Sequence, residues 1–421
     1  MFKLAHRSRL IFASMFIFLG CEKLEVLSQD ITDIEVTSGT YEASSITSAD
    51  VLERAWQMAN VTWTPVNPVP KRGGGYYSSG NSVSGVPYSS VKEINTYLFQ
   101  DVSYHTFMTA VHNPNSVLYT EDISQTPYHG LNCAPYYGGV CSSTVMYALG
   151  VNIPYYANQI KEQPFMHQLE QQEVDSLRVC DVIWKPGHVQ MVFDVEHRAD
   201  TLYRITMFET SGNSAHITSY SAKGFKNLWT TYEYVAYRRE NIIYTPKPDD
   251  FEGFAPIDYN DDLCPSKGDR AVYRTDDTIT VNIFNSGYQE IVLQRGGREV
   301  MVDTYDGGTF QYTDLEPGIY ECYLQGGGAK SQAVSFEVIR TDVQVETANN
   351  GNLLIRFSSD ATADYAAVCD IHGSSQYYPI SEEDRFRGRI VVPAPVQSER
   401  YCKVVFRGEY GTMINRPIKV M

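Results

Sequence analysis

One cysteine follows a pair of glycines and precedes the pattern of a helix. Residues 136–150 read YYGGVCSSTVMYALG, where the apolar spacing predicts a helix over 142–149 with Cys141 at its N-terminal end. The dipole and free N–H groups at such an end favour a thiolate and can hold an oxyanion. Gly138 and Gly139 let the backbone come close to a substrate. This setting predicts a nucleophile, and a buried structural cysteine is the alternative.

A nucleophilic cysteine needs a base, and one histidine is well placed to be it. Of the 9 histidines, His188 alone opens a strongly alternating strand pattern, HVQMVFDV. It follows Pro186-Gly187, a turn that should place it at a strand end, where clefts are lined. The interval from Cys141 is long enough for the chain to complete a helix and return. A hydrogen-bonded strand end with no catalytic role is the alternative for His188.

Helices followed by an antiparallel sheet should position these two residues. Thr47, with Asp50 three residues later, predicts a helix start, and an apolar stripe continues it. A second helix fits 103–112. Strand patterns run from Val182 to Tyr237. The sequence therefore predicts an α+β domain over residues 46–240.

The rest of the chain reads as β-structure after a linker. Residues 241–267 are rich in Pro and Asp, which indicates a linker. Residues 268–340 predict an immunoglobulin-like β-sandwich, in which Tyr320-Glu321-Cys322 has the spacing of a tyrosine corner and Gly296-Gly297 can turn a hairpin. Residues 341–421 predict a second all-β sandwich module.

The N-terminus has the features of an export signal. Three basic residues precede an apolar run from Leu10 to Leu19, which is too short to span a bilayer. The run ends in Gly20-Cys21, which resembles a bacterial lipobox. The resemblance implies a lipoprotein signal peptide over 1–21 and lipidation of Cys21. Residues 22–45 are polar and acidic without a periodic pattern, which predicts a tether. The expected location is the cell envelope, lipid-anchored to a membrane, with the outer membrane favoured. An ordinary signal peptide is the alternative.

The net charge argues against some classes of partner, and the cysteine count limits the disulfides. The net charge of −16 argues against nucleic acid and against an electrostatic grip on anionic lipid. Without Cys21, seven of the 8 cysteines remain, so at least one is free or paired between chains. A disulfide between Cys133 and Cys180 is one open possibility, with two core cysteines as the other. No metal-ligand spacing and no cofactor motif is present, so neither is expected.

The two motifs together resemble the NlpC-type, papain-like cell-wall peptidases. That family has a Tyr-Gly-x-Asp-Cys-Ser-Gly-Phe helix start, then a Gly-Asp turn and a Gly-His-Val strand start. The resemblance makes Cys141 the nucleophile, Asp181 the turn acid and His188 the base. It places the third polar residue at Glu209, with Ser211 and Asn213 as alternatives. GVPYSS resembles the cleft-lining stretch, which makes Tyr88 a substrate-side residue. Tyr137, Gly139 and Ser142, beside Cys141, are the other expected substrate-binding residues.

The resemblance implies hydrolysis of an amide in peptidoglycan stem peptides through an acyl-enzyme, without metal or cofactor. The chain departs from the family motif at Val140, Ser143, Thr144 and Cys180. Because of these departures, a non-enzymatic surface lipoprotein that binds glycan or protein with a degenerate domain stays open. An acyl or amide transferase on the same scaffold is a third possibility. The partners of the sandwich modules are unknown from sequence.

Overall fold

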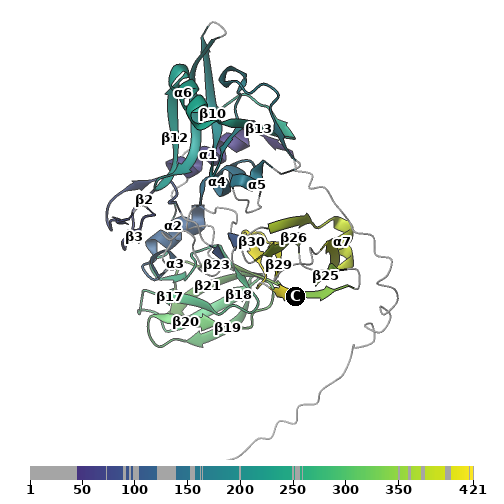
Figure 1. Ribbon diagram of the computed structural model, residues 1–421. Helices are drawn as coiled ribbons and strands as arrows, with labels where there is room; N and C mark the ends of the chain where they lie inside the picture. Colours follow the sequence, from purple (N-terminus) through teal and green to yellow (C-terminus); the bar gives the residue numbers. More distant parts are fainter. Residues whose placement is uncertain are drawn as a thin grey trace, which may run out of the picture.

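The described chain forms three units, one of helices with an antiparallel sheet and two of packed β-sheets (Figure 1). The computed structural model describes residues 45–420, apart from 73, 89–91, 94–95, 98–103, 121–138, 152–156, 162, 164, 199–200, 249–250, 252–256, 258, 349–350, 359–361, 371–374, 394–399 and 417. The expected signal peptide over 1–21 with Cys21, the expected tether except Ser45, and Cys133 lie outside these residues. The helices of the described chain are too short or too polar to span a bilayer.

The first helix begins where its capping residues predict. α1 (Ser48–Asn60) has Thr47 as N-cap, whose hydroxyl accepts the Asp50 N–H at 3.1 Å, while the Asp50 carboxylate accepts the Thr47 N–H. Its buried stripe is the one expected from the sequence and includes Val51, Leu52, Ala55, Met58 and Ala59. α2 (Tyr104–His112) matches the second expected helix. Both assignments follow from local signals and are confirmed.

The central sheet of this unit is antiparallel, in the order β12-β11-β10-β9-β13-β8. Its first four members form a meander, in which each strand pairs with the next along the chain. The strands are β8 (Met166–Gln168), β9 (Val182–Lys185), β10 (His188–Arg198), β11 (Thr201–Ser211), β12 (Ser214–Ser221) and β13 (Val235–Arg239).

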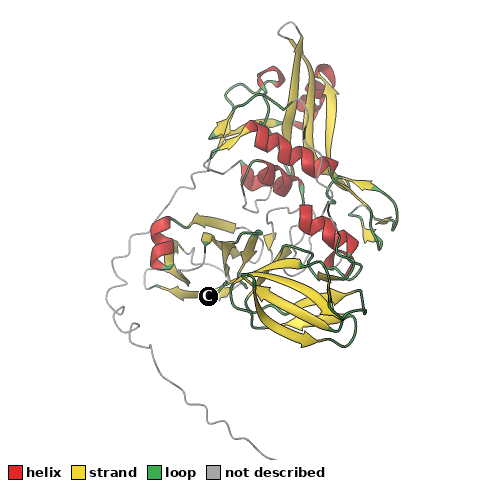
Figure 2. Cartoon of the chain, turned by 180° about the vertical axis from the view of Figure 1, so that it is seen from behind, coloured by secondary structure: helices red, strands yellow, loops and turns green. Residues whose placement is uncertain are grey.

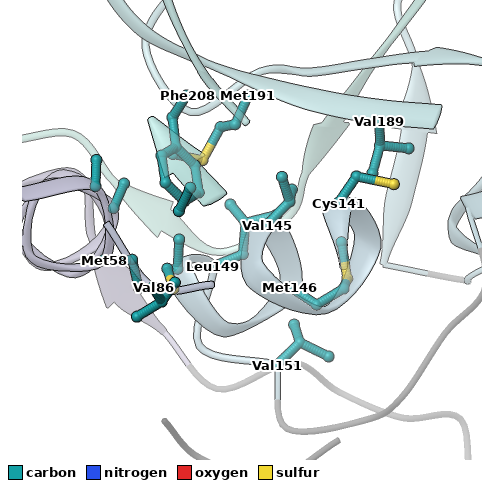
Figure 3. Close-up of a cluster of buried hydrophobic side chains, with 14 of the residues drawn as sticks. Met58, Val86, Cys141, Val145, Met146, Leu149, Val151, Val189, Met191 and Phe208 are labelled. Carbon is teal, nitrogen blue, oxygen red and sulfur yellow. The ribbon is translucent and has the colours of Figure 1, made fainter. Parts of the chain in front are cut away.

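Helices cover both faces of this sheet. α1 and α4 (Cys141–Ala148) cover one face, and Figure 3 shows Val145 of α4 directed at Phe208 and Met191 of the sheet. α6 (Ala222–Tyr232) covers the other face through Phe225. The two faces of the sheet contribute to separate hydrophobic cores, so the sheet is buried on both sides. α4 packs into the first of these cores. Smaller elements complete the unit: β1 (Ile46–Thr47), β2 (Thr62–Trp63), β3 (Val69–Pro70), β4 (Tyr76–Tyr77), β5 (Val83–Ser84), β6 (Lys92–Glu93), β7 (Thr96–Tyr97), α3 (Val117–Thr120), α5 (Ala157–Ile160), a 3₁₀ turn (Val174–Ser176) and β14 (Ile242–Ile243).

The second unit is a β-sandwich, as the sequence predicts. A sheet β15-β17-β20 faces a sheet β16-β23-β21-β18-β19, and one core draws residues from both. Tyr320 donates from its hydroxyl to the Glu316 carbonyl at 2.7 Å, which is the hydrogen bond of a tyrosine corner. Its strands are β15 (Leu263–Pro265), β16 (Ala271–Arg274), β17 (Ile279–Ile283), β18 (Glu290–Arg295), β19 (Arg298–Thr304), β20 (Thr309–Tyr312), β21 (Gly318–Gly326), β22 (Ala329–Lys330) and β23 (Val334–Ile339).

The expected linker over 241–267 is shorter in the structure at both ends. β14 pairs in parallel with β1, so Ile242 and Ile243 belong to the first unit. At the other end Leu263 is fully buried and pairs with Ile283, so the sandwich begins before residue 268. Composition marks the stretch as a linker, but the sandwich core recruits its apolar end. The linker between the first two units is therefore shorter than the predicted range, residues 241–267.

The third unit is a second sandwich, and it packs against both others (Figures 1 and 2). Its sheets are β24-β25-β28 and β27-β26-β29-β30, with β31 also paired to β29. Arg274 of the first sandwich donates to the Ile414 carbonyl at 2.6 Å, and Tyr365 joins the core of the first unit. Its elements are β24 (Val343–Thr347), β25 (Asn352–Phe357), β26 (Ala363–Asp370), β27 (Ser375–Pro379), α7 (Glu382–Arg387), β28 (Arg389–Pro393), β29 (Arg400–Arg407), β30 (Thr412–Ile414) and β31 (Ile418–Val420).

Candidate active site

His188 stands at the start of β10 because a two-residue turn ends there. Lys185 and His188 are paired across the β9–β10 hairpin, and Pro186 and Gly187 form its turn. Gly187 has a φ of +77°, a conformation that favours glycine over every other residue type. His188 therefore lies at the end of an interior strand of the sheet, as its sequence context predicts.

Cys141 is the first residue of α4. The N-cap residue, Val140, has a hydrocarbon side chain that accepts no hydrogen bond from the first turn. The N–H groups beside Cys141 consequently have no capping side chain from that residue. Figure 3 shows Cys141 beside Val189, the residue that follows His188. The thiol thus lies at the positive end of a helix and next to the strand that carries the histidine.

The residues that differ from the family motif have structural roles here. The Ser143 hydroxyl accepts the Val140 N–H at 2.9 Å and so takes over part of the capping. The Thr144 hydroxyl bonds to the Thr210 hydroxyl at 2.8 Å, which ties α4 to β11. Cys180 has a φ of +69°, the left-handed conformation for which glycine is the common choice.

Gly139 is required by close packing at the start of α4. A Cβ atom there would lie 2.6 Å from the Ser143 hydroxyl oxygen and 2.8 Å from a Thr144 methyl carbon. Both neighbours are held in place by the bonds that fix α4. The backbone before Cys141 can therefore approach the helix only with glycine at this position.

His188 bridges the thiol and a carboxylate. Its Nε2 lies 2.7 Å from Glu209 Oε2, and the two side chains are 20% and 12% exposed. Burial lowers the pKa of His188, but hydrogen bonds with Cys141 and Glu209 outweigh this and raise the pKa to about 9. Burial raises the pKa of Glu209, but hydrogen bonds from His188 and His216 outweigh this and lower the pKa to about 2. The structure thus brings Cys141, His188 and Glu209 together.

The proton positions follow from which atoms can only accept. The ionised carboxylate of Glu209 is an acceptor only, so His188 Nε2 carries a hydrogen. The nitrogen that remains for exchange with the Cys141 thiol is Nδ1. Neither Ser211 nor Asn213 is the residue bonded to the ring, so Glu209 is the third polar residue in this geometry.

A second histidine touches the same carboxylate, and sequence analysis missed it. His216 Nε2 lies 3.5 Å from Glu209 Oε1. A signal for it was present, because the two residues Gly212 and Asn213 form a tight turn between Ser211 and Ser214. Counting back from that turn places Glu209 directly opposite His216, as the strand register has it.

Tyr88 lies beside the start of α4. Tyr88 forms a parallel bridge with Gly139, and its N–H donates to the Asn213 carbonyl at 2.6 Å. The guanidinium of Arg72 lies 4.1 Å from the centre of the Tyr88 ring. Of the other expected substrate-binding residues, Ser142 is buried in the first turn of α4 and Tyr137 lies outside the described residues.

Asp181 has a structural partner away from the thiol. The carboxylate is fully buried and forms two hydrogen bonds with the Arg238 guanidinium, at 2.6 and 2.7 Å. It also accepts the Arg178 N–H at 2.9 Å, which closes the turn before β9. The hydrogen bonds with Asp181 raise the pKa of Arg238, although burial opposes them. Asp181 therefore anchors β9 to β13.

Replacing Arg238 by methionine should lower the free energy of unfolding of the first unit by about 3 kcal/mol at pH 7, because a buried carboxylate loses its counter-charge. All four tryptophans lie in this unit, so tryptophan fluorescence during urea unfolding reports on it alone. The double variant Asp181→Asn/Arg238→Met is the matched control and should recover part of the loss. A loss below about 1 kcal/mol in the single variant would show that the pair is not structural.

Five cysteines of the described chain carry free thiols, and the described residues contain no metal-binding cluster. Cys141, Cys180, Cys264, Cys322 and Cys402 are all free and buried. No group of three or more His, Cys, Asp or Glu residues in the described part of the chain could hold a metal ion. What the site can offer is a thiol, two imidazoles and one carboxylate.

Comparisons with known proteins add little to this geometry. No family model matches the chain, and no curated protein matches it. Among solved structures, a two-domain fibronectin type III segment of chicken tenascin is 12% identical and covers 38% of this chain and 97% of its own, with a TM-score of 0.24. Fibronectin(III)-like modules of Clostridium thermocellum CbhA are 14% identical and cover 38% of this chain and 91% of their own, with a TM-score of 0.19. Scores this low carry no argument, so the two sandwiches rest on the sheets and cores described above.

Proposed function

We propose that this chain is an exported, lipid-anchored cysteine endopeptidase or amidase with an NlpC-type, papain-like first domain. Its substrate is an amide bond of peptidoglycan stem peptides, and Cys21 is its lipid anchor. The observation that carries the proposal is the series of contacts from the Cys141 thiol through His188 to Glu209. A thiol at a helix start, an imidazole and an ionised carboxylate are the parts of a nucleophile, its base and the group that orients the base.

The chemistry assigned to these groups has two halves. In the first, His188 Nδ1 takes the Cys141 proton, and the thiolate sulfur attacks the amide carbon. The N–H groups of the first turn of α4 hold the oxyanion that forms. The C–N bond then breaks, His188 gives its proton to the departing amine, and the acyl group stays on sulfur.

In the second half, water replaces the amine. His188 takes a proton from the water, whose oxygen attacks the thioester carbon. The C–S bond breaks, the carboxylic acid leaves, and the proton returns to the thiolate–imidazole pair. Glu209 stays ionised throughout and stabilises the imidazolium in both halves. We assign substrate contacts to Tyr88 and Gly139, which pair with each other beside the start of α4.

The test is digestion of synthetic stem peptides that contain a γ-D-glutamyl amide, followed by mass spectrometry. The expected result is a pair of fragments whose masses sum to substrate plus one water, with none from Cys141→Ala. Adding a second amine to the reaction separates hydrolysis from transfer, because a transferase would give an amide product instead. Binding of intact glycan or peptide without any cleavage would replace the proposal with the non-enzymatic lipoprotein.

A further inference from the structure

We propose that His216 is a positioning residue of this site, whose imidazolium holds the Glu209 carboxylate at the angle from which Glu209 orients His188. The inference rests on the proposed function for its effect on catalysis. The contacts that carry it can be tested without any turnover.

The first observation is that each carboxylate oxygen of Glu209 faces a different histidine. Oε2 lies 2.7 Å from His188 Nε2, and Oε1 lies 3.5 Å from His216 Nε2. Glu209 and His216 are direct cross-strand partners on β11 and β12, so the contact is built into the sheet register. A carboxylate with one oxygen held can still rotate about its last bond. With both oxygens held, its plane is fixed, and so is the direction in which it accepts from His188.

The second observation is the protonation that the contacts of His216 require. Its Nδ1 lies 3.0 Å from the Ser214 carbonyl oxygen, which can only accept, so Nδ1 carries a hydrogen. Its Nε2 faces an ionised carboxylate, which also only accepts. Both ring nitrogens therefore donate, and the ring that makes both contacts is an imidazolium. The hydrogen bond to Ser214 anchors the ring, and the ion pair with Glu209 depends on that anchor.

The charges around His216 agree with this state. The hydrogen bond to Glu209 is the main effect and raises the pKa of His216 above its usual value, while burial and the charge of His188 on β10 oppose it. Tyr220 on β12 and Tyr234 before β13 also face the charge of Glu209. The helices packed on β12 also carry charges. Asp50 caps α1, Glu53 accepts a hydrogen bond from Gln57, and Arg54 lies over the Tyr147 ring. On α6, Lys226 pairs with Asp175 and Lys223 is exposed.

The turnover-independent test is a titration of the histidine rings by ¹⁵N NMR in the full chain. In the wild type, both ring nitrogens of His216 should carry a hydrogen at neutral pH. The ring should lose one proton at a pH above about 6.5, the usual pKa of histidine. In Glu209→Gln the titration of His216 should return to the usual range, because the carboxylate charge is gone. A His216 that titrates at the usual value in the wild type, unchanged in Glu209→Gln, would overturn the proposal.

The catalytic test uses two substitutions. His216→Ala should lower kcat by about tenfold with little change in KM, because a base misoriented by a fraction of an ångström reacts more slowly while binding is untouched. His216→Gln can still donate an N–H to Glu209 and should recover most of kcat. His197→Ala, an exposed histidine at the far end of β10, is the matched control. Wild-type kcat in His216→Ala would overturn the positioning role.

The two proposals can fail separately. If the wild type cleaves no stem peptide, the proposed function fails, and the NMR titration still decides whether His216 is bound to Glu209. If the wild type cleaves but His216 titrates normally in both proteins, the proposed function stands and the role of His216 is refuted.

Discussion

Replacing Cys141 by alanine is expected to lower kcat/KM for stem-peptide hydrolysis by about ten-thousandfold or more. No other described thiol lies next to His188, so nothing can form the acyl-enzyme in its place. The first unit should stay folded, because the change removes one sulfur and leaves in place the hydrogen bonds of Ser143 and Thr144 and the apolar packing of α4. Cleavage is measured by mass spectrometry and folding by tryptophan fluorescence.

A matched control is Cys402→Ala, which removes another buried cysteine, from the second sandwich. It should leave kcat/KM within about twofold of the wild type, because Cys402 belongs to a different core. Retained cleavage in Cys141→Ala would contradict the account. Unfolding of that variant would call for Cys141→Ser, which keeps the shape of the side chain and should be almost as inactive.

Replacing Glu209 by alanine is expected to lower kcat/KM by about a hundredfold to a thousandfold, because His188 loses the acceptor that orients it and stabilises its charge. The pH profile should change as well. The carboxylate raises the pKa of His188, so its removal lets that pKa fall from about 9 towards the usual value near 6.5. His188 must be protonated to release the amine, so the alkaline limb of kcat/KM should move down from about pH 9.

Glu209→Gln keeps a hydrogen-bond acceptor for His188 but removes the negative charge, so it separates the effects of orientation and charge. The amide oxygen can accept the His188 Nε2 hydrogen, so part of kcat should return, while the alkaline limb stays low because the charge is absent. Ser211→Ala, two residues further along β11, is the control and should leave both quantities unchanged. An alkaline limb that stays near pH 9 in Glu209→Gln would show that this carboxylate does not act on His188.

The parts of the site that local signals determine could be predicted from the sequence. Cys141 starts a helix because the apolar spacing begins there, and His188 starts a strand because Pro186-Gly187 turns the chain. Thr47 and Asp50 cap α1 through contacts three residues apart. Each of these features depends on neighbours in the sequence, so no knowledge of the sheet was needed.

The parts that depend on pairing between distant segments could not be predicted in the same way. The alternation in β10 continues to Phe193, but a register shift between Val192 and Asp194 moves Val195 into the core with α6. A bulge of this kind adds a residue without a composition signal. The Thr144–Thr210 hydrogen bond could not be predicted either, because it joins residues far apart in sequence.

The unit boundaries show a further limit of composition. The Pro and Asp content of 241–267 resembles a linker throughout, yet Leu263 is buried in the first sandwich. Whether such a residue is free or buried depends on the space that the core leaves for it. That space is a property of the assembled sheets.

The measurement that tests the central claim most directly is the rate of iodoacetamide alkylation at Cys141 against pH, in the wild type and in His188→Ala. The position of alkylation is read by mass spectrometry. The account predicts alkylation at neutral pH that is much faster in the wild type than in His188→Ala, because His188 takes the Cys141 proton and the helix end favours the negatively charged sulfur. Equally slow alkylation of the two proteins would contradict it, because His188 would then not activate the thiol.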